Sequence, residues 1–286
     1  TIDGATTVNA TGAVSLSSGA NTGVFGSFSQ IGIGGRGADA ATMNGDTVVT
    51  FGNGLTLDAS AGGQNGYVQI GAGGDDADGV ITSNTRVTGT GDIVLTAGGG
   101  ADSSAQIGSG GNDANGGNIT GNVIVDGDSL TLNGGGGSGA QASIGNVFEG
   151  DGDSITGVIT TNITNQIFLN GGSGTVSYAQ IGHLLRDAGT FTIDGSVSVV
   201  AGGNIALTGG ADGGAMIGHG VSSGNAGVLG TRTGGLNVYT DGSITLSDGA
   251  SGAALISHQS GGGVGSVDYS GGTNGGDSGN SLVGLS

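Results

Sequence analysis

The sequence repeats itself at a nearly constant interval, and this feature limits the chain to a small set of folds. An isoleucine followed by glycine or serine returns after 39, 37, 37, 37, 36 and 39 residues, at Ile31, Ile70, Ile107, Ile144, Ile181, Ile217 and Ile256. A period of this size indicates stacked supersecondary units. The sequence therefore predicts an array of about seven repeats of roughly 37 residues.

A second repeated feature assigns β-structure to the unit. Pairs of aliphatic residues separated by one residue recur with the same period, at Val14/Leu16, Leu55/Leu57, Ile93/Leu95, Leu130/Leu132, Ile167/Leu169, Ile205/Leu207 and Ile244/Leu246. This spacing places both side chains on one face of a strand. The residues between them, such as Thr56 and Thr131, are predicted to face solvent.

Two further strands complete the repeat. Around the repeated Ile, the residue two before it and the Ile itself are predicted to point inward, while the residue between them, Gln69 or Gln106 for example, points outward. A third run, such as "NVIVDG" from Asn122 or "VSVVAGG" from Val197, ends in a turn rich in Gly or Asp. We expect three strands and three turns in each repeat.

Equivalent strands that recur every 37 residues stack most simply as parallel rungs. The predicted fold is all-β, a right-handed parallel β-helix (β-solenoid). One coil per repeat is the preferred arrangement, and two coils of half that length remain the alternative. Residues 1–260 form the predicted array, and residues 261–286 form a glycine-rich segment that partly continues the last repeat. Neither end shows a capping pattern, so we expect a segment of a longer chain or a protomer whose ends stack on neighbouring copies.

The composition agrees with stacked rungs. Proline, which removes a backbone donor from a sheet, is absent, and 21 of the 22 acidic residues are Asp, which suits tight turns. A column of polar residues directly after the aliphatic pairs is predicted to form a hydrogen-bonded ladder: Ser17, Asp58, Thr96, Asn133, Asn170, Thr208 and Ser247.

Charge and residue content argue against several function classes. The net charge of -18, with four Arg and no Lys, disfavours nucleic acid and anionic membranes as partners. A sugar-cleaving groove needs paired carboxylates at a defined separation, whereas the acidic residues here lie in repeated turns, so we predict no enzymatic activity. An ice-binding face needs a regular Thr array, which Val94 and Phe168 interrupt.

The three histidines form the first candidate metal site. His183, His219 and His258 each lie two residues after the repeated Ile. With one coil per repeat, their imidazoles stack roughly 4.8 Å apart, which suits either a structural ladder or a shared zinc or copper ion.

Asp-rich loops after the same strand are candidate calcium ligands, since calcium prefers clustered oxygen atoms. Asx turns explain the same residues without any ion, so we expect no cofactor, and calcium at these loops is the alternative. The candidate ligands are Asp76, Asp78, Asp113, Asp151 and Asp153.

The largest departures from the repeat replace glycines with bulky residues. These residues are predicted to form an exposed contact patch, or to cover an end of the solenoid core: Phe148, Leu184, Leu185 and Arg186.

The unit "GDIVLTAGGGADSSAQIGSGGNDANGGNITGNVIVDGDSLTL" resembles the repeats of large bacterial adhesins of the filamentous haemagglutinin type, which are exported by two-partner (type V) secretion. The resemblance implies an extracellular fibre on the bacterial cell surface, an outer-membrane secretion partner, and roles in adhesion or biofilm formation. We therefore expect a non-enzymatic structural fibre or adhesin shaft whose partners are neighbouring copies or flanking repeats. A repeated module that binds a host or surface glycan is the alternative.

Overall fold

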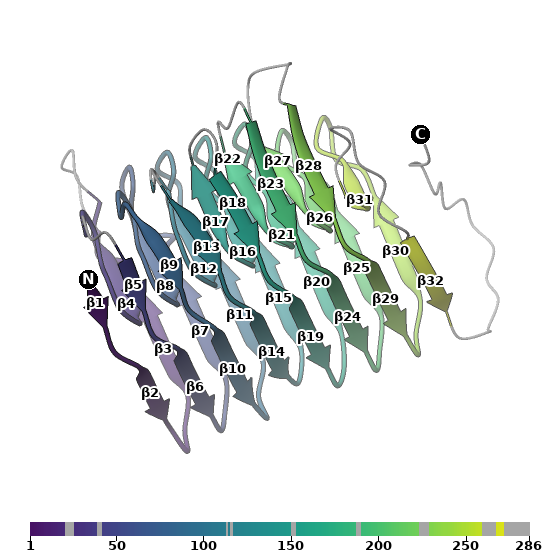
Figure 1. Cartoon of the computed structure of the whole chain (residues 1–286). Coiled ribbons are helices and arrows are strands. Elements are labelled where there is room, and N and C mark those ends of the chain that lie inside the picture. The colour runs from purple at the N-terminus through teal and green to yellow at the C-terminus, as the bar shows by residue number, and fades with distance from the viewer. Residues whose placement is uncertain are drawn as a thin grey trace.

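The computed structural model describes residues 1–20, 26–38, 42–112, 114, 117–149, 153–186, 190–222, 229–258 and 267–271. Within them every regular element is a β-strand, and the strands pair in parallel into five sheets. The coils follow one another along one axis, so that strands of a sheet lie side by side from the purple N-terminal end to the yellow C-terminal end (Figure 1). The predicted all-β solenoid is confirmed.

Sheets 1 and 2 contain the first two strands of each coil. Sheet 1 consists of β1 (Ile2–Asp3), β5 (Thr42–Asn44), β9 (Val80–Thr82), β13 (Asn118–Thr120), β18 (Asp153–Thr156), β23 (Thr190–Asp194) and β28 (Leu229–Thr233). Sheet 2 consists of β2 (Thr6–Asn9), β6 (Thr47–Phe51), β10 (Thr85–Gly89), β14 (Val123–Gly127), β19 (Ile159–Ile163), β24 (Val197–Ala201), β29 (Leu236–Thr240) and β32 (Val267–Gly271). The pairing of β32 with β29 extends sheet 2 into the glycine-rich C-terminal segment.

Sheets 3 and 4 contain the two most regular sequence columns. Sheet 3 consists of β3 (Val14–Ser17), β7 (Leu55–Asp58), β11 (Ile93–Thr96), β15 (Leu130–Asn133), β20 (Ile167–Asn170), β25 (Ile205–Thr208) and β30 (Ile244–Ser247). Sheet 4 consists of β4 (Phe28–Ile31), β8 (Tyr67–Ile70), β12 (Ser104–Ile107), β16 (Ala142–Ile144), β21 (Ala179–Ile181), β26 (Ala215–Ile217) and β31 (Ala254–Ile256). Sheet 5 is short and consists of β17 (Val147–Glu149), β22 (Leu184–Arg186) and β27 (Gly220–Ser222).

The register shows that one repeat makes one coil. Leu55 pairs with Ile93, and Ile93 with Leu130, so the neighbour of each strand lies one full repeat away. The same holds in sheet 4, where Ile70 pairs with Ile107. The alternative of two half-length coils is therefore wrong, because it would place strands from the two halves of one repeat next to each other.

Each coil also contains more strands than the sequence pattern predicts. Sheet 1 adds a fourth strand, and sheet 5 adds a fifth in three coils. The strands of sheet 1 have two to five residues, and β9 and β13 each bury a single aliphatic side chain, Ile81 or Ile119, so no aliphatic pair marks them in the sequence. Parallel neighbours still pair along them, because the coils above and below hold the backbone in register.

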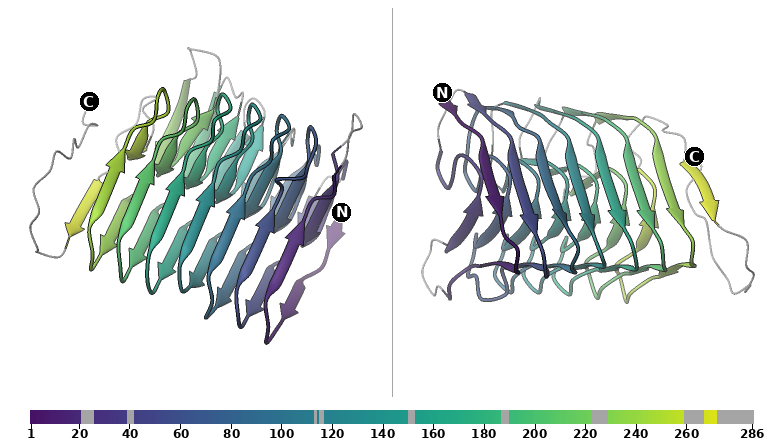
Figure 2. Two further views of the ribbon diagram at one scale, coloured as in Figure 1. Left: turned by 180° about the vertical axis from the view of Figure 1, so that it is seen from behind. Right: turned by 90° about the horizontal axis from the view of Figure 1, so that it is seen from below.

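Two separate cores run along the axis. The larger one lies between sheets 2, 3 and 4 and is formed by the predicted aliphatic columns, for example Val87, Leu95 and Ile107. The smaller one lies under sheet 1 and includes Met43, Phe148 and other buried side chains. We call the part around the first core the body and the part around the second core the lobe. Views from behind and from below show the coils in successive layers (Figure 2).

The outward side chains of sheet 3 face solvent, as predicted, with Thr56 and Phe168 exposed. The predicted outward Gln side chains do not. Gln69, Gln106 and Gln180 are buried, because the lobe covers the second face of sheet 4. A strand between two cores has no solvent face, so the alternation of residue types along sheet 4 does not reveal that both of its faces are covered.

Glycine after the repeated Ile is required by close approach of the coils. Gly145 has a φ of 146°, in a region that other residues rarely adopt. A Cβ atom on Gly145 would lie 2.1 Å from the carbonyl oxygen of Gly182 in the next coil. The turn that leads from the body into the lobe therefore depends on glycine.

Candidate functional site

The Asp-rich loops do not gather into one cluster within the described residues. Asp76 is exposed and Asp78 is half-buried in the turn after β8. Asp153 begins β18, while Asp113 and Asp151 lie outside the described residues. In the described part of the chain, no group of three His, Cys, Asp or Glu side chains is placed to hold a metal ion. Calcium binding at these loops stays a prediction.

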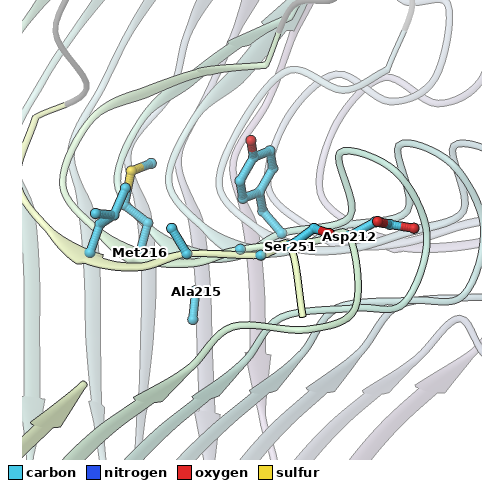
Figure 3. Close-up of a pocket in the computed structure, with 9 residues that line it drawn as sticks. Asp212, Ala215, Met216 and Ser251 are labelled. Atoms are coloured by element: carbon cyan, nitrogen blue, oxygen red, sulfur yellow. The ribbon is translucent and has the colours of Figure 1, made fainter. Parts of the chain in front are cut away.

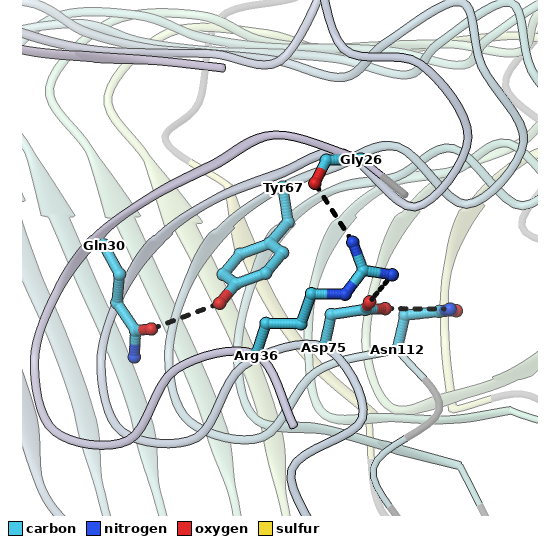
Figure 4. A network of polar contacts seen from close by, with 6 residues as sticks. All are labelled: Gly26, Gln30, Arg36, Tyr67, Asp75 and Asn112. Carbon is cyan, nitrogen blue, oxygen red and sulfur yellow. Dashed lines mark hydrogen bonds and ion pairs between the residues drawn. The ribbon is translucent and has the colours of Figure 1, made fainter. Parts of the chain in front are cut away.

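The buried carboxylate of this region is Asp75, which belongs to the same Asp-rich loop as Asp76 and Asp78. Its Oδ2 atom lies 3.1 Å from Nη2 of Arg36 in the preceding coil, and its Oδ1 atom accepts a hydrogen bond of 3.4 Å from Nδ2 of Asn112 in the next coil. Arg36 also donates from Nη1 to the carbonyl oxygen of Gly26 at 3.0 Å. Figure 4 shows these residues linked across the coils. The carboxylate therefore connects three consecutive coils.

An aromatic pair lies beside this ion pair. The rings of Phe28 and Tyr67 stack with centroids 5.0 Å apart. The hydroxyl of Tyr67 donates to Oε1 of Gln30 at 3.4 Å (Figure 4). Burial and, to a smaller extent, the charge of Asp75 raise the pKa of Tyr67. Tyr67 therefore stays a neutral hydrogen-bond donor.

The glutamines of sheet 4 form a buried ladder between coils. Nε2 of Gln69 donates to the carbonyl oxygens of Gly108 and Gly110 at 2.9 and 2.7 Å. Gln106 makes the equivalent contact with the carbonyl of Gly145 at 3.2 Å, and Gln180 with that of Gly218 at 3.1 Å. These amides satisfy backbone carbonyls that the glycine turns leave inside the protein.

The three histidines stack as predicted. The ring centroids of His183 and His219 lie 5.0 Å apart, and those of His219 and His258 lie 4.7 Å apart. Nδ1 of His219 accepts from the backbone N–H of His183 at 3.1 Å, and Nδ1 of His258 accepts from that of His219 at 3.0 Å. Each Nδ1 atom therefore connects its coil to the preceding one.

The second ring nitrogen, Nε2, joins two segments of the same coil. Nε2 of His183 donates to the carbonyl oxygen of Gly157 at 3.0 Å, and Nε2 of His219 donates to that of Gly195 at 2.8 Å. Because Nδ1 accepts and Nε2 donates, these rings are neutral with the proton on Nε2. A metal ion at either nitrogen would displace a backbone partner, and zinc or copper binding stays a prediction.

The same column continues toward the N-terminus without histidine. Oδ1 of Asn146 accepts from the backbone N–H of Ser109 at 2.9 Å, and its Nδ2 donates to the carbonyl of Gly121 at 2.9 Å. Oγ of Ser109 accepts from the N–H of Ala72 at 3.3 Å. The backbone N–H of Asn146 in turn donates to Nδ1 of His183 at 3.0 Å. Asn146 thus makes the same two kinds of contact as a histidine.

The predicted contact patch is largely buried. Phe148 and Leu185 belong to the core of the lobe, and Leu184 is also buried. Arg186 is the last residue of β22, and the structure describes its backbone but not its side chain. The expectation of exposed apolar residues is corrected: bulky residues replace glycines here because they fill the lobe and form sheet 5.

A small hollow opens beside Tyr178. Ala179 pairs with Ala215, so Gly214 lies level with Tyr178, and a Cβ atom on Gly214 would lie 2.8 Å from Cε1 of the Tyr178 ring. The hollow has a volume of about 150 Å³ and is also lined by Asp212, Met216 and Ser251. Figure 3 shows Met216 at one end, and Asp212 and Ser251 at the other. An aromatic ring, a carboxylate and a hydroxyl therefore lie around one concave surface.

Comparison of the chain with protein-family models, with curated proteins and with solved structures found no match. Among the described residues there is no helix with the length and apolar character needed to span a membrane. The chain is a β-solenoid repeat protein by its own architecture.

Two further site residues escaped the sequence pattern. Asn146 was not predicted because its repeat has no histidine. Its position two residues after Ile144 nevertheless places it in the same column as the histidines. Arg232 lies in β28 opposite Ile193, in a column of buried aliphatic residues. Burial lowers the pKa of Arg232 to about 10, which leaves it charged at neutral pH. Only the register of sheet 1 places this charge inside the lobe.

Proposed function

We propose that the chain is a non-enzymatic segment of an extracellular structural fibre or adhesin shaft, whose role is rigid reach from a bacterial surface. The observation that carries the proposal is the continuity of the stack: strands of sheets 2, 3 and 4 pair in register from coil to coil along the whole described array. An uninterrupted core and parallel backbone ladders resist bending, because bending would break hydrogen bonds in several sheets at once.

Buried side chains strengthen the stack at its least regular part. The Gln ladder, the Asp75 ion pair and the His column each join consecutive coils in the lobe. Such contacts hold neighbouring coils at a fixed rotation as well as a fixed distance. A rod of this kind suits a shaft that separates a binding tip from its anchor.

The resemblance to filamentous haemagglutinin-type repeats supports the surface location. On the basis of this resemblance, we also propose that the chain is exported through an outer-membrane partner and associates with flanking repeats or neighbouring copies. Its role would be in adhesion or biofilm formation. The acidic surface and the scarcity of Arg, with Lys absent, agree with partners other than nucleic acid.

The test is to lengthen the rod. Residues 108–144 make one complete repeat, so inserting additional copies after Ile144 preserves the register. We expect each copy to lengthen the particle by roughly 4.8 Å, the spacing of parallel strands. Small-angle scattering and electron cryomicroscopy of variants with two and four extra copies measure this length. An unchanged length, or loss of folding after insertion, would contradict the shaft proposal.

The hollow at Tyr178 favours glycan binding as a second candidate function. Sugar rings stack on aromatic faces and bond to carboxylates and hydroxyls, which Tyr178, Asp212 and Ser251 supply. Glycan-array screening followed by calorimetry tests it, with Tyr178→Ala as the variant and Tyr239→Ala, an exposed tyrosine on sheet 2, as the control. Saturable binding that only Tyr178→Ala removes would establish this function. Equal loss in both variants, or no binding, would exclude the hollow.

A further inference from the structure

The His column is confined to one part of the array. The chain contains three histidines, and all three occupy this column, in the coils that follow Asn146. In the earlier coils the same positions hold Ala72, Ser109 and Asn146, which do not titrate between pH 7 and 5. Ser109 and Asn146 therefore accept a backbone N–H from the preceding coil as the histidines do, but through groups that do not titrate, whereas Ala72 has no polar side chain.

Protonation is incompatible with the contacts that the rings make. Nδ1 of each ring accepts a backbone N–H, from Asn146, His183 and His219 respectively. A proton on Nδ1 would place two donors against each other and break the connection between coils. Because the rings of His183 and His219 are buried, the new charge would also lack water.

The surroundings add repulsion. Each charged ring would lie 4.7–5.0 Å from its neighbour. Arg232 of β28 is the other charged side chain that acts on His219 and His258, and it opposes protonation of both. At His183, the hydrogen bond to the carbonyl oxygen of Gly157 raises the pKa of the ring, but burial lowers it by more.

The pKa shifts have the direction that this geometry requires. Burial lowers the pKa of His183 to about 4 and that of His219 to about 2, and burial with Arg232 lowers that of His258. An unfolded histidine has a pKa near 6.5. The neutral rings therefore stabilise the fold fully above about pH 6.5, and this contribution is lost as the pH falls below that value.

We propose that the His column is an acid-sensitive contact between coils. Its hydrogen bonds hold the later coils together at neutral pH and are lost in mildly acidic solution, while the coils before Asn146 stay stacked. Its effect is local because the proton-sensitive contacts end at Asn146. For each ring that stays neutral in the folded state, the equilibrium constant for unfolding is expected to be roughly 20-fold larger at pH 5 than at pH 7.

Hydrogen exchange measured by mass spectrometry on the full chain tests the proposal. Exchange is followed at pH 7 and pH 5 and corrected for the intrinsic rates. We expect peptides containing β21, β26 and β31 to lose protection at pH 5, and peptides containing β8 and β12 to keep it. An ordinary carboxyl group has a pKa near 4, below this window.

Asn146 supplies the matched variants. In the triple variant His183→Asn, His219→Asn and His258→Asn, we expect equal protection at both pH values, because Asn makes the same contacts without titrating. The reverse variant, Asn146→His, keeps the native histidines and is expected to extend the loss of protection at pH 5 to β16. It tests the idea even where the triple variant fails to fold.

A direct reading of the rings completes the test. Nitrogen-15 chemical shifts of the imidazoles are expected to report the Nε2–H tautomer at pH 7 and no titration near 6.5 in the folded chain. The proposal is overturned if the rings titrate near 6.5 with the fold intact, if the later coils keep their protection at pH 5, or if Asn146→His leaves the profile unchanged.

Discussion

The body and the lobe share one stacking geometry but are stabilised by different kinds of contact. On sheets 2 and 3 of the body, a side chain either enters the aliphatic core or faces water, and the type of the core residue repeats from coil to coil. In the lobe, equivalent positions change from Ala72 to Ser109, Asn146 and His183 while the contact with the next coil persists. The comparison teaches that the body conserves shape along its axis, whereas the lobe conserves hydrogen bonding.

The difference follows from solvent. On the outer faces of sheets 2 and 3, water satisfies any polar group that a neighbour does not, so contacts there contribute little individually. In the lobe, a polar group without a partner is costly, since it has been removed from water. Matched residues of the same type in the two regions therefore test the comparison directly.

The largest expected contrast is between two phenylalanines. Phe148 is fully buried in the lobe, and Phe168 is 37% exposed on sheet 3. We expect Phe148→Ala to lower the free energy of unfolding by about 3–5 kcal/mol, and Phe168→Ala by about 1 kcal/mol or less. Urea denaturation followed by circular dichroism measures both. Equal losses would show that the lobe is not a packed core.

Two ion pairs give the next contrast, because both join an Arg to an Asp of the next coil at 3.1 Å. Arg36 and Asp75 have 20% and 2% of their side chains exposed, whereas Arg86 and Asp126 have 49% and 25%. We expect Arg36→Ala to cost about 3 kcal/mol, because it leaves a buried carboxylate. Arg86→Ala is expected to cost about 0.2–1 kcal/mol and to lose that effect in 1 M salt, where screening is strong.

Unfolding measured at low and high salt separates the two cases. Arg36→Ala could instead lower the free energy of unfolding as little as Arg86→Ala does, with the same sensitivity to salt. That result would mean that water reaches Asp75.

Two asparagines give the smallest contrast. Asn146 is buried and bonds to Ser109 and Gly121, whereas Asn133 on sheet 3 bonds to Thr96 and Asn170 near the surface. We expect Asn146→Ala to cost about 2 kcal/mol and Asn133→Ala about 0.5–1 kcal/mol. Thermal unfolding at pH 7 compares them. A larger loss for Asn133→Ala would reverse the ranking of lobe and body.

The predicted polar ladder on sheet 3 is present in part. Asn133 bonds to Thr96 and Asn170, as the column predicted. Asp58 instead accepts from the backbone N–H of Ser60 at 2.8 Å, which is an Asx turn. Residue type decides between the two, because an amide both donates and accepts whereas a carboxylate only accepts.

The stacked histidines could be predicted from their spacing, but their role could not. Their position two residues after the repeated Ile places them in one column once the coil length is known. Whether the ring nitrogens bind a metal or the backbone depends on the turns at Gly157 and Gly195, which come from another part of the coil. The sequence likewise places Asp75 in an Asp-rich loop, but only the structure shows that its carboxylate pairs with Arg36 of the preceding coil.

The sequence by itself determined the period, the parallel stacking, the aliphatic columns of the body and the position of the His column. These properties depend on residue spacing along the chain, and spacing is visible in the sequence. Only the tertiary structure decided that sheet 4 is buried on both faces, that Phe148 and Leu185 pack inside, and that Arg232 lies within the lobe. Those properties depend on which segment of the coil folds over which, and the repeat period leaves that choice open.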